Sequence, residues 1–361
     1  MTHTIKVHET ERDDNIGVTK KEVTGANDLH FDTPTVSFRP KDGSPPSLFV
    51  NEVIKHIDND TIKSLENDGT SQYVQAIKNE HQPKALNLVI FNLKIDNFLT
   101  KENLDTLAQT LYSASDKLLF LPTVKSSLLS DGKKVEMTKI DKYIEMMDTI
   151  IKKTNDVGNN KEFVGTIPLI PATPVRKIID FYHKHEIQTF AIDGCTKDII
   201  LNDADLRVVL SAIDGESHCL SDTLIYACNL GYPKIVKNES RADDFLSIFA
   251  HVDIFGSMFK GRGGKSKKPP PTLTPKKSKL FSNDSYSYQS TTIAEAREKF
   301  GSPMSGDVIK SINKKRQLIE TGHVREMVGK EGIKPFLLKK TSVGQPIVNR
   351  LESLAKLQKS T

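Results

Sequence analysis

The chain contains 361 residues, among them 51 lysines and arginines and 46 aspartates and glutamates, and its mean hydropathy is −0.39. This length suits one large α/β domain with extensions, or two domains. No window contains the roughly 18 consecutive apolar residues that a membrane span requires, and the charged N-terminus lacks the apolar stretch of a secretory signal. We therefore expect a cytoplasmic protein without a membrane partner.

The formal net charge of +5 is divided unevenly along the chain. Residues 257–361 contain 22 basic and 8 acidic side chains, a net of +14, so the remaining residues carry −9. Basic residues concentrated in this way predict a surface for the phosphates of nucleic acid. The alternative is a set of ordinary solvated helices with lysine and arginine on their outer faces.

In chain order, residues 1–30 are charged and poor in large apolar groups, which predicts a disordered leader. Residues 31–36 suggest a short strand, and helical patterns follow at 48–57 and 71–79. The odd number of cysteines, Cys195, Cys219 and Cys228, fits neither a disulfide framework nor a zinc site. We expect free thiols, no metal and no cofactor.

From residue 85 onward, apolar runs alternate with amphipathic helical patterns. The expected strands are 85–93, 117–124, 163–170, 188–193, 222–229 and 252–255. The helices expected between them are 101–113, 139–152, 174–185, 203–213 and 241–250. This order predicts a parallel sheet, and we prefer a TIM-like (β/α) barrel over 31–259, with a doubly wound sheet as the alternative. A barrel of eight strands requires two more, from 31–84 or 95–140.

Beyond the expected barrel, residues 260–279 contain eight basic side chains and no acid, with three consecutive prolines and three glycines. This composition predicts a mobile basic linker or loop over 260–290. Residues 291–361 then predict a basic, mainly helical C-terminal extension. Its helices are expected near 293–300, 307–328 and 346–357.

Four landmarks follow one another in the second half of the chain. A helix beginning near Arg176 leads to a strand ending in FAIDG at 190–194. The segments NLGYP at 229–233 and HVDIFGS at 251–257 come next, and an Ile-, Arg- and Gln-containing helix follows at 309–328. This order resembles the tRNA-guanine transglycosylases and their relatives that act on DNA in 7-deazaguanine pathways. The resemblance covers roughly 160–330 and rests on no single specific motif.

The resemblance implies a barrel that binds tRNA or DNA and exchanges guanine or 7-deazaguanine bases, as a glycosyltransferase of the pentosyl type. The nucleophilic Asp of that family corresponds to Gly256 here, which has no side chain. The family's Asp-Ser-Gly-Gly-Phe-Gln segment is absent, with LPTV at 121–124 in a comparable place, and its zinc site is missing because no Cys follows Cys228. A covalent mechanism needs a carboxylate, so the chain is either a divergent enzyme or a noncatalytic partner.

Three acids are candidate catalytic residues. Asp193 ends an expected strand, where barrel enzymes place their catalytic groups, although it could instead cap the next helix. Asp253 lies in the last expected strand, with the alternatives that it orients the backbone or faces a neighbouring residue. Asp284 echoes an Asp-Ser-x-x-Tyr segment of the archaeal enzymes, with a turn residue as the alternative. The candidate substrate-binding residues are Gly194, Gly231 and Tyr232.

The basic residues are candidate nucleic-acid ligands through counterion release. They are Lys260, Arg262, Lys265, Lys267, Lys268, Lys276, Lys277, Lys279, Lys314, Lys315 and Arg316. Tyr286 and Tyr288 either stack on bases or pack against the barrel. Two further hypotheses stay open: a non-enzymatic nucleic-acid-binding scaffold, and an unrelated barrel enzyme acting on a small phosphorylated substrate. Assembly as a homodimer or heterodimer is also open.

Overall fold

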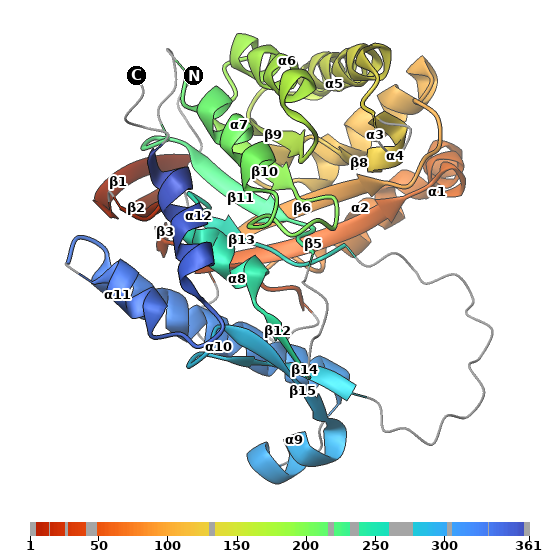
Figure 1. The fold of residues 1–361 in the computed structure, drawn as a ribbon. Helices are drawn as coiled ribbons and strands as arrows, with labels where there is room; N and C mark the ends of the chain where they lie inside the picture. The colour runs from red at the N-terminus through yellow and green to blue at the C-terminus, as the bar shows by residue number, and fades with distance from the viewer. Residues whose placement is uncertain are drawn as a thin grey trace.

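The computed structural model describes most of the chain. The described residues are 5–13, 15–25, 28–40, 49–129, 134–215, 220–231, 238–259, 277–301, 305–330 and 332–356. They form a mixed α/β fold, with parallel strands at the centre, helices packed over them and a smaller helical and antiparallel part below (Figure 1). None of the helices in these ranges is both long enough and apolar enough to cross a membrane.

Two parallel sheets form the centre of the fold. The larger sheet has six strands, in the order β4 (Thr35–Val36), β13 (Ile254–Phe255), β11 (Leu224–Cys228), β10 (Thr189–Asp193), β9 (Glu162–Pro168) and β7 (Leu118–Phe120). The smaller sheet has the order β5 (Val50–Ile57), β6 (Leu86–Leu93) and β8 (Thr123–Val124). The expected parallel sheet is confirmed, whereas the strand pairing does not form one continuous closed barrel.

The two sheets adjoin at both edges. At one edge, the Phe38 N–H donates to the Val50 carbonyl at 3.0 Å, and the Glu52 N–H donates to the Phe38 carbonyl at 2.6 Å. At the other edge, β7 and β8 follow one another in the chain, and β7 pairs with β9 while β8 pairs with β6. The single strand expected at 117–124 is therefore divided between the sheets. The helix expected at 48–57 is wrong, because these residues form β5.

Helices connect successive strands and cover one side of them. They are α1 (Asn59–Ser64), the π-helical turn η2 (Leu65–Gly69), α2 (Thr70–Lys78), α3 (Lys101–Ala114), α4 (Ser126–Leu129), α5 (Met137–Val157), α6 (Ala172–Lys184) and α7 (Asp203–Ile213). Strand β6 is buried along its whole length. Its Val89 and Phe91 pack toward the helices, whereas Leu88 and Ile90 join a second, inner cluster. This follows from the two-residue period of a strand and explains its uninterrupted apolar sequence.

The N-terminal residues form an antiparallel sheet and not a disordered leader. Strands β1 (Ile5–Asp13), β2 (Val18–Gly25) and β3 (Leu29–Thr33) pair in that order. Their apolar side chains, including Val23 and Phe31, enter the inner cluster of the parallel strands. The leader expected over 1–30 is wrong for the described residues, because the charged side chains of these strands alternate with the apolar ones and lower the average hydrophobicity.

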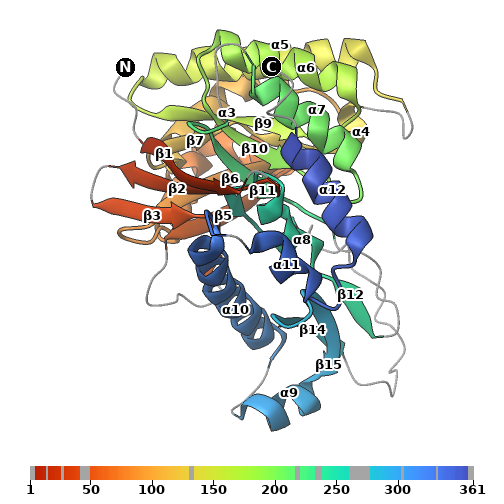
Figure 2. The ribbon, with the colours of Figure 1, turned by 60° about the vertical axis from the view of Figure 1, so that its left-hand side comes forward.

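Most of the C-terminal part packs below the parallel strands, whereas its last helix, α12 (Gln345–Ala355), lies beside α7 (Figure 2). Its antiparallel sheet has the order β12 (Glu239–Arg241), β15 (Ser287–Thr292), β14 (Lys277–Ser282). Its helical elements are α8 (Asp243–Leu246), the 3-10 turn η3 (Ser247–Phe249), α9 (Ile293–Phe300), α10 (Gly306–Met327), α11 (Ile333–Leu338) and α12 (Gln345–Ala355). The helices expected after residue 291 are confirmed. The linker expected over 260–290 is wrong from residue 277 onward, and 260–276 lie outside the described residues.

Candidate active site at the carboxyl end of the parallel strands

Asp193 is the last residue of β10, as the sequence predicts, and its side chain is buried, with 3% exposure. Its Oδ1 accepts hydrogen bonds from the Cys195 N–H and the Asn229 side-chain amide, both at 2.8 Å. Burial raises the pKa of Asp193 to about 6, and the two hydrogen bonds and the nearby Lys94 ammonium oppose this rise. Near neutral pH, such a carboxyl group can both give and take a proton.

A second buried carboxylate, that of Glu52 on β5, escaped the sequence analysis. Its side chain is fully buried. It accepts hydrogen bonds from the Tyr226 hydroxyl on β11, from the Ser257 N–H at 3.2 Å and from the Ser37 hydroxyl at 3.3 Å. The Arg39 Nε lies 3.7 Å from its Oε2. The one feature of the sequence that could have indicated this buried carboxylate is the position of Glu52, an acidic residue within the largely apolar run 48–57.

Glu52 lies directly against Gly256, the position that corresponds to the nucleophile in the resembled family. A Cβ on Gly256 would lie 2.8 Å from the Glu52 Oε1 and would overlap the Tyr226 hydroxyl. Burial and the nearby Glu52 carboxylate raise the pKa of Tyr226, which keeps its phenol protonated as a donor. The space that an aspartate at 256 would need is therefore filled by a carboxylate from another strand and its hydrogen-bond donor.

The loops that follow β10 and β11 pack on each other. Gly194 lies against Leu230, and the Gly231 N–H donates to the Lys197 carbonyl at 2.8 Å. A Cβ on either glycine would meet neighbouring atoms, which in the case of Gly231 include the Thr196 backbone. Gly194 directly follows Asp193, and Gly231 lies two residues after Asn229, whose side-chain amide contacts Asp193. The close packing explains both glycines, and substrate binding by them stays a prediction. The third predicted substrate-binding residue, Tyr232, lies outside the described residues.

Asp253 does not lie with Asp193. It precedes β13 at the opposite end of the strands, where its carboxylate forms a buried ion pair with Lys21 of β2 at 2.9 Å. It also accepts hydrogen bonds from the Ile225 N–H at 2.8 Å and from the Thr33 hydroxyl at 3.4 Å. These contacts attach the N-terminal sheet to the parallel strands, so the geometry supports the backbone-orienting alternative over catalysis.

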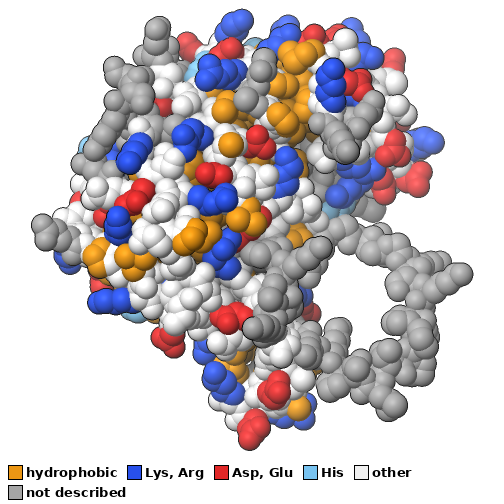
Figure 3. Space-filling view, viewed as in Figure 1, with side chains coloured by type: hydrophobic (Ala, Val, Ile, Leu, Met, Phe, Trp, Pro, Cys, Tyr) orange, Lys and Arg blue, Asp and Glu red, His pale blue; other side chains and the backbone are white. Residues whose placement is uncertain are grey.

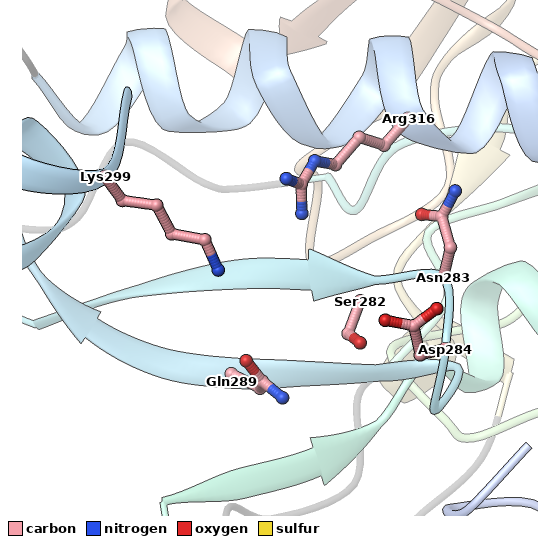
Figure 4. Close-up of a pocket in the computed structure, with 6 residues that line it drawn as sticks. All are labelled: Ser282, Asn283, Asp284, Gln289, Lys299 and Arg316. Atoms are coloured by element: carbon pink, nitrogen blue, oxygen red, sulfur yellow. The ribbon is translucent and has the colours of Figure 1, made fainter. Parts of the chain in front are cut away.

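Asp284 also lies apart from the strand ends. It is exposed in the turn between β14 and β15, and it lines a pocket of about 430 Å³ with Ser282, Asn283, Gln289, Lys299 and Arg316 (Figure 4). A second pocket, of about 270 Å³, lies near the start of β6 and contains Asn87 and Asp116. Neither pocket includes the candidate catalytic residue Asp193 or the candidate substrate-binding residues Gly194 and Gly231.

The predicted nucleic-acid ligands fall into three groups. Lys260, Arg262, Lys265, Lys267, Lys268 and Lys276 lie outside the described residues. Lys277 and Lys279 lie on β14, and Lys315 is exposed on α10. Lys314 points inward, with its ammonium 5.3 Å from the Phe255 ring centroid, whereas Arg316 lines the 430 Å³ pocket. On the face in Figure 3, basic and acidic side chains are interspersed and do not form one basic patch.

Tyr286 and Tyr288 are buried, with 0% and 5% exposure. Their rings pack with Phe245 and Phe281 in an aromatic cluster beneath α10. The alternative of packing is therefore correct, and neither ring is available to stack on a base. Within the described ranges, no group of three or more His, Cys, Asp or Glu side chains is arranged to hold a metal ion.

The fold and this site define an α/β protein with two buried carboxyl groups. That of Asp193 lies at the carboxyl end of β10, and that of Glu52 lies near the amino end of β5, beside the residues that follow β13. No family model matches the chain, and its sequence matches none of the curated proteins.

Proposed function

We propose that the protein is a divergent transglycosylase-type barrel that binds tRNA or DNA and exchanges a guanine or 7-deazaguanine base. The observation that carries the proposal is the Glu52 carboxylate beside Gly256, which supplies from β5 the group that the resembled family carries after the equivalent of β13. Asp193 is the second reacting group, because its raised pKa makes both protonation states available near neutral pH.

In this mechanism, a Glu52 oxygen attacks the sugar C1′ while the bond from C1′ to the base nitrogen breaks. Asp193 gives its proton to the departing base, which leaves a glycosyl ester on Glu52 and a carboxylate on Asp193. The incoming base loses its proton to Asp193 and attacks C1′, and the ester bond breaks to restore Glu52. The Tyr226 hydroxyl and the Ser257 N–H orient Glu52 throughout.

A closed (β/α) barrel of eight strands is the fold that this proposal assumes. Two features support this fold. The first is that the two parallel sheets adjoin at both edges, through Phe38 at one edge and through β7 and β8 at the other. The second is that alternate residues of β5, β6, β7, β9, β10, β11 and β13 converge in one inner cluster. Such layers of inward-facing side chains fill a barrel, and catalytic groups then lie at the carboxyl ends of its strands.

The basic third of the chain supports nucleic acid as the partner. Residues 260–279, with eight basic side chains and no acid, begin directly after Phe259. Phe259 belongs to the inner cluster, and its N–H donates to the Asn229 side-chain oxygen at 3.1 Å, on the residue that also contacts Asp193. Phe259, the last described residue before the basic stretch, therefore lies beside the candidate site, and the cations that follow it in the sequence would bind phosphates by counterion release.

The experiment is incorporation of radiolabelled guanine into bulk tRNA and into DNA by the full chain. We expect incorporation by the wild type and a loss of about a thousandfold or more with Glu52→Gln, which removes the nucleophile. Asp193→Asn should reduce the rate about 10²–10⁴-fold. The surface variant Asp141→Asn is the matched control and should exchange at the wild-type rate. No incorporation by the wild type into either nucleic acid would overturn the catalytic proposal.

Two observations favour a second candidate, a noncatalytic nucleic-acid-binding partner or scaffold. Phe259 is 5% exposed over the inner cluster, and the Glu52 side chain is fully enclosed by its donors. A site that stays closed in this way would bind nucleic acid without exchanging a base. This candidate predicts salt-dependent binding together with no incorporation of labelled guanine in the experiment above.

A further inference from the structure

We propose that the pocket between the β14–β15 hairpin and helices α9 and α10 binds a phosphodiester group of nucleic acid. The proposal rests on the proposed function only for its choice of partner, since the pocket lies on the C-terminal part and contains neither Asp193 nor Glu52. The pocket volume of about 430 Å³ is in the range of sites for small ligand groups.

Two cations from different helices converge on this pocket. Lys299 extends from the end of α9, and Arg316 extends from the middle of α10, both toward the hairpin (Figure 4). The ion pairs found within the described part of the chain include neither of them. A pair of cations that converges on a concave site and forms no ion pair with a protein carboxylate is suited to bind an anion.

The Arg316 guanidinium is held in place before any ligand binds. Its Nη1 donates to the Phe281 carbonyl at 2.8 Å, and the group lies 5.2 Å from the Phe300 ring centroid. The Lys299 ammonium lies 5.7 Å from the centroid of the same ring. Phe300 thus positions both cations, and a guanidinium fixed in this way loses little conformational entropy when it binds an oxyanion.

The remaining lining residues favour a singly charged ligand. Asp284 contributes one carboxylate, so the two cations and this acid give the pocket a net charge of +1. A phosphodiester carries one negative charge, whereas a terminal phosphate near neutral pH carries close to two and would be repelled more strongly by Asp284. Ser282 and Gln289 add a hydroxyl and an amide that can bond the sugar or the phosphate oxygens.

The test is fluorescence anisotropy with the full chain and labelled single-stranded RNA or DNA of one sequence, titrated over a series of salt concentrations. We expect Arg316→Gln and Lys299→Gln each to weaken binding about five- to tenfold. Each should also lower the slope of log affinity against log salt by about 0.7–0.9, because one cation is lost. Asp284→Asn should strengthen binding. Thermal unfolding of each variant establishes that it is folded.

Lys310→Gln is the matched control, because Lys310 lies on the same helix α10, pairs with Asp307 and does not line the pocket. Its effect on affinity should stay within about twofold, as expected for one exposed charge remote from the contact. The proposal is overturned if Lys310→Gln weakens binding as much as Arg316→Gln does. It is also overturned if both pocket variants bind like the wild type, or if the wild type binds neither oligonucleotide.

Two further arms identify the ligand. The relative affinities for RNA and DNA show which nucleic acid supplies the phosphodiester, and dependence on Arg316 with either one supports the pocket. Oligonucleotides with and without a 5′-phosphate should bind equally, and a requirement for the 5′-phosphate would overturn the phosphodiester assignment. If the pocket variants weaken binding while the wild type exchanges no guanine, the proposed catalysis fails and the pocket stands.

Discussion

The Glu52 carboxylate on β5 and the backbone of Gly256 after β13 are in contact, so that Glu52 Oε1 lies 2.8 Å from the point where residue 256 would carry a Cβ. Glycine is required at 256 because the neighbouring atoms leave no room for a side chain. Because of this contact, the site has room for a carboxylate at position 52 or at position 256, but not at both.

Gly256→Asp, which would place at this position the nucleophilic residue of the transglycosylases that the sequence resembles, should therefore destabilise the protein. The new side chain overlaps the Tyr226 hydroxyl and places a second buried carboxylate beside Glu52. We expect the free energy of unfolding in urea to fall by about 2–4 kcal/mol. Adding Glu52→Ala should recover part of this loss.

The control for this substitution is Gly306→Asp, because a Cβ at Gly306, the first residue of α10, would meet nothing within 4 Å. An acid in the first turn of a helix is neutral or slightly stabilising. If Gly256→Asp unfolds at the same urea concentration as Gly306→Asp, the contact between Glu52 and residue 256 is contradicted.

Asp193→Asn should stabilise the protein more at pH 8 than at pH 4. The pKa of Asp193 is raised from 3.8 to about 6 in the fold, so the folded state holds its proton more tightly than the unfolded state. The resulting penalty appears as pH rises from about 4 to about 6 and is fully present above that window. Asparagine keeps an oxygen for the bonds from Cys195 and Asn229 and has no charge to bury.

Urea unfolding of the wild type and of Asp193→Asn over this pH range measures the difference. We expect the variant to gain on the order of 1–3 kcal/mol between the acidic and the alkaline end. A difference in unfolding free energy that does not change with pH would show that Asp193 titrates normally and would remove its assignment as the proton-transfer group.

Asp253→Asn should destabilise the fold severely. The substitution leaves the Lys21 ammonium, which is 3% exposed, without its counter-charge. We expect a loss of about 3–5 kcal/mol in the free energy of unfolding, with recovery in the double variant that also carries Lys21→Met. The exposed pair of Asp141 and Lys177 is the control, and Asp141→Asn should cost less than about 1 kcal/mol. Equal losses at the two sites would argue against a buried ion pair.

The substitution Tyr288→Phe tests whether Tyr288 stabilises the fold by its buried contacts or stacks on a base of the nucleic acid. The Tyr288 hydroxyl donates to Asp244 at 2.6 Å and accepts from the Gln317 amide at 2.8 Å, and both partners are buried. We expect a loss of about 1–3 kcal/mol in unfolding free energy and an unchanged affinity for RNA. Tyr112→Phe, which removes an exposed bond to Asn160, should cost less. Weaker RNA binding with unchanged stability would restore the stacking hypothesis.

The strands that the sequence predicts best are those buried on both faces. Strand β6 appears as an uninterrupted apolar run because helices cover one side of it and the inner cluster covers the other. Strand β5 was missed because its inward face carries Glu52, and β1 and β2 were missed because charged side chains alternate with their apolar ones. Average hydrophobicity over a window cannot separate such strands from a disordered segment.

The alternation of apolar runs and amphipathic helices was enough to predict a parallel sheet and to place Asp193 at the end of a strand, because both depend on local periodicity and element order. The tertiary structure alone decided the partners: Glu52 meets Gly256, Asp253 meets Lys21, and Arg316 meets Lys299 across a pocket. These contacts depend on which strands become neighbours and which face each side chain takes, and a single strand does not encode the neighbour that it will meet.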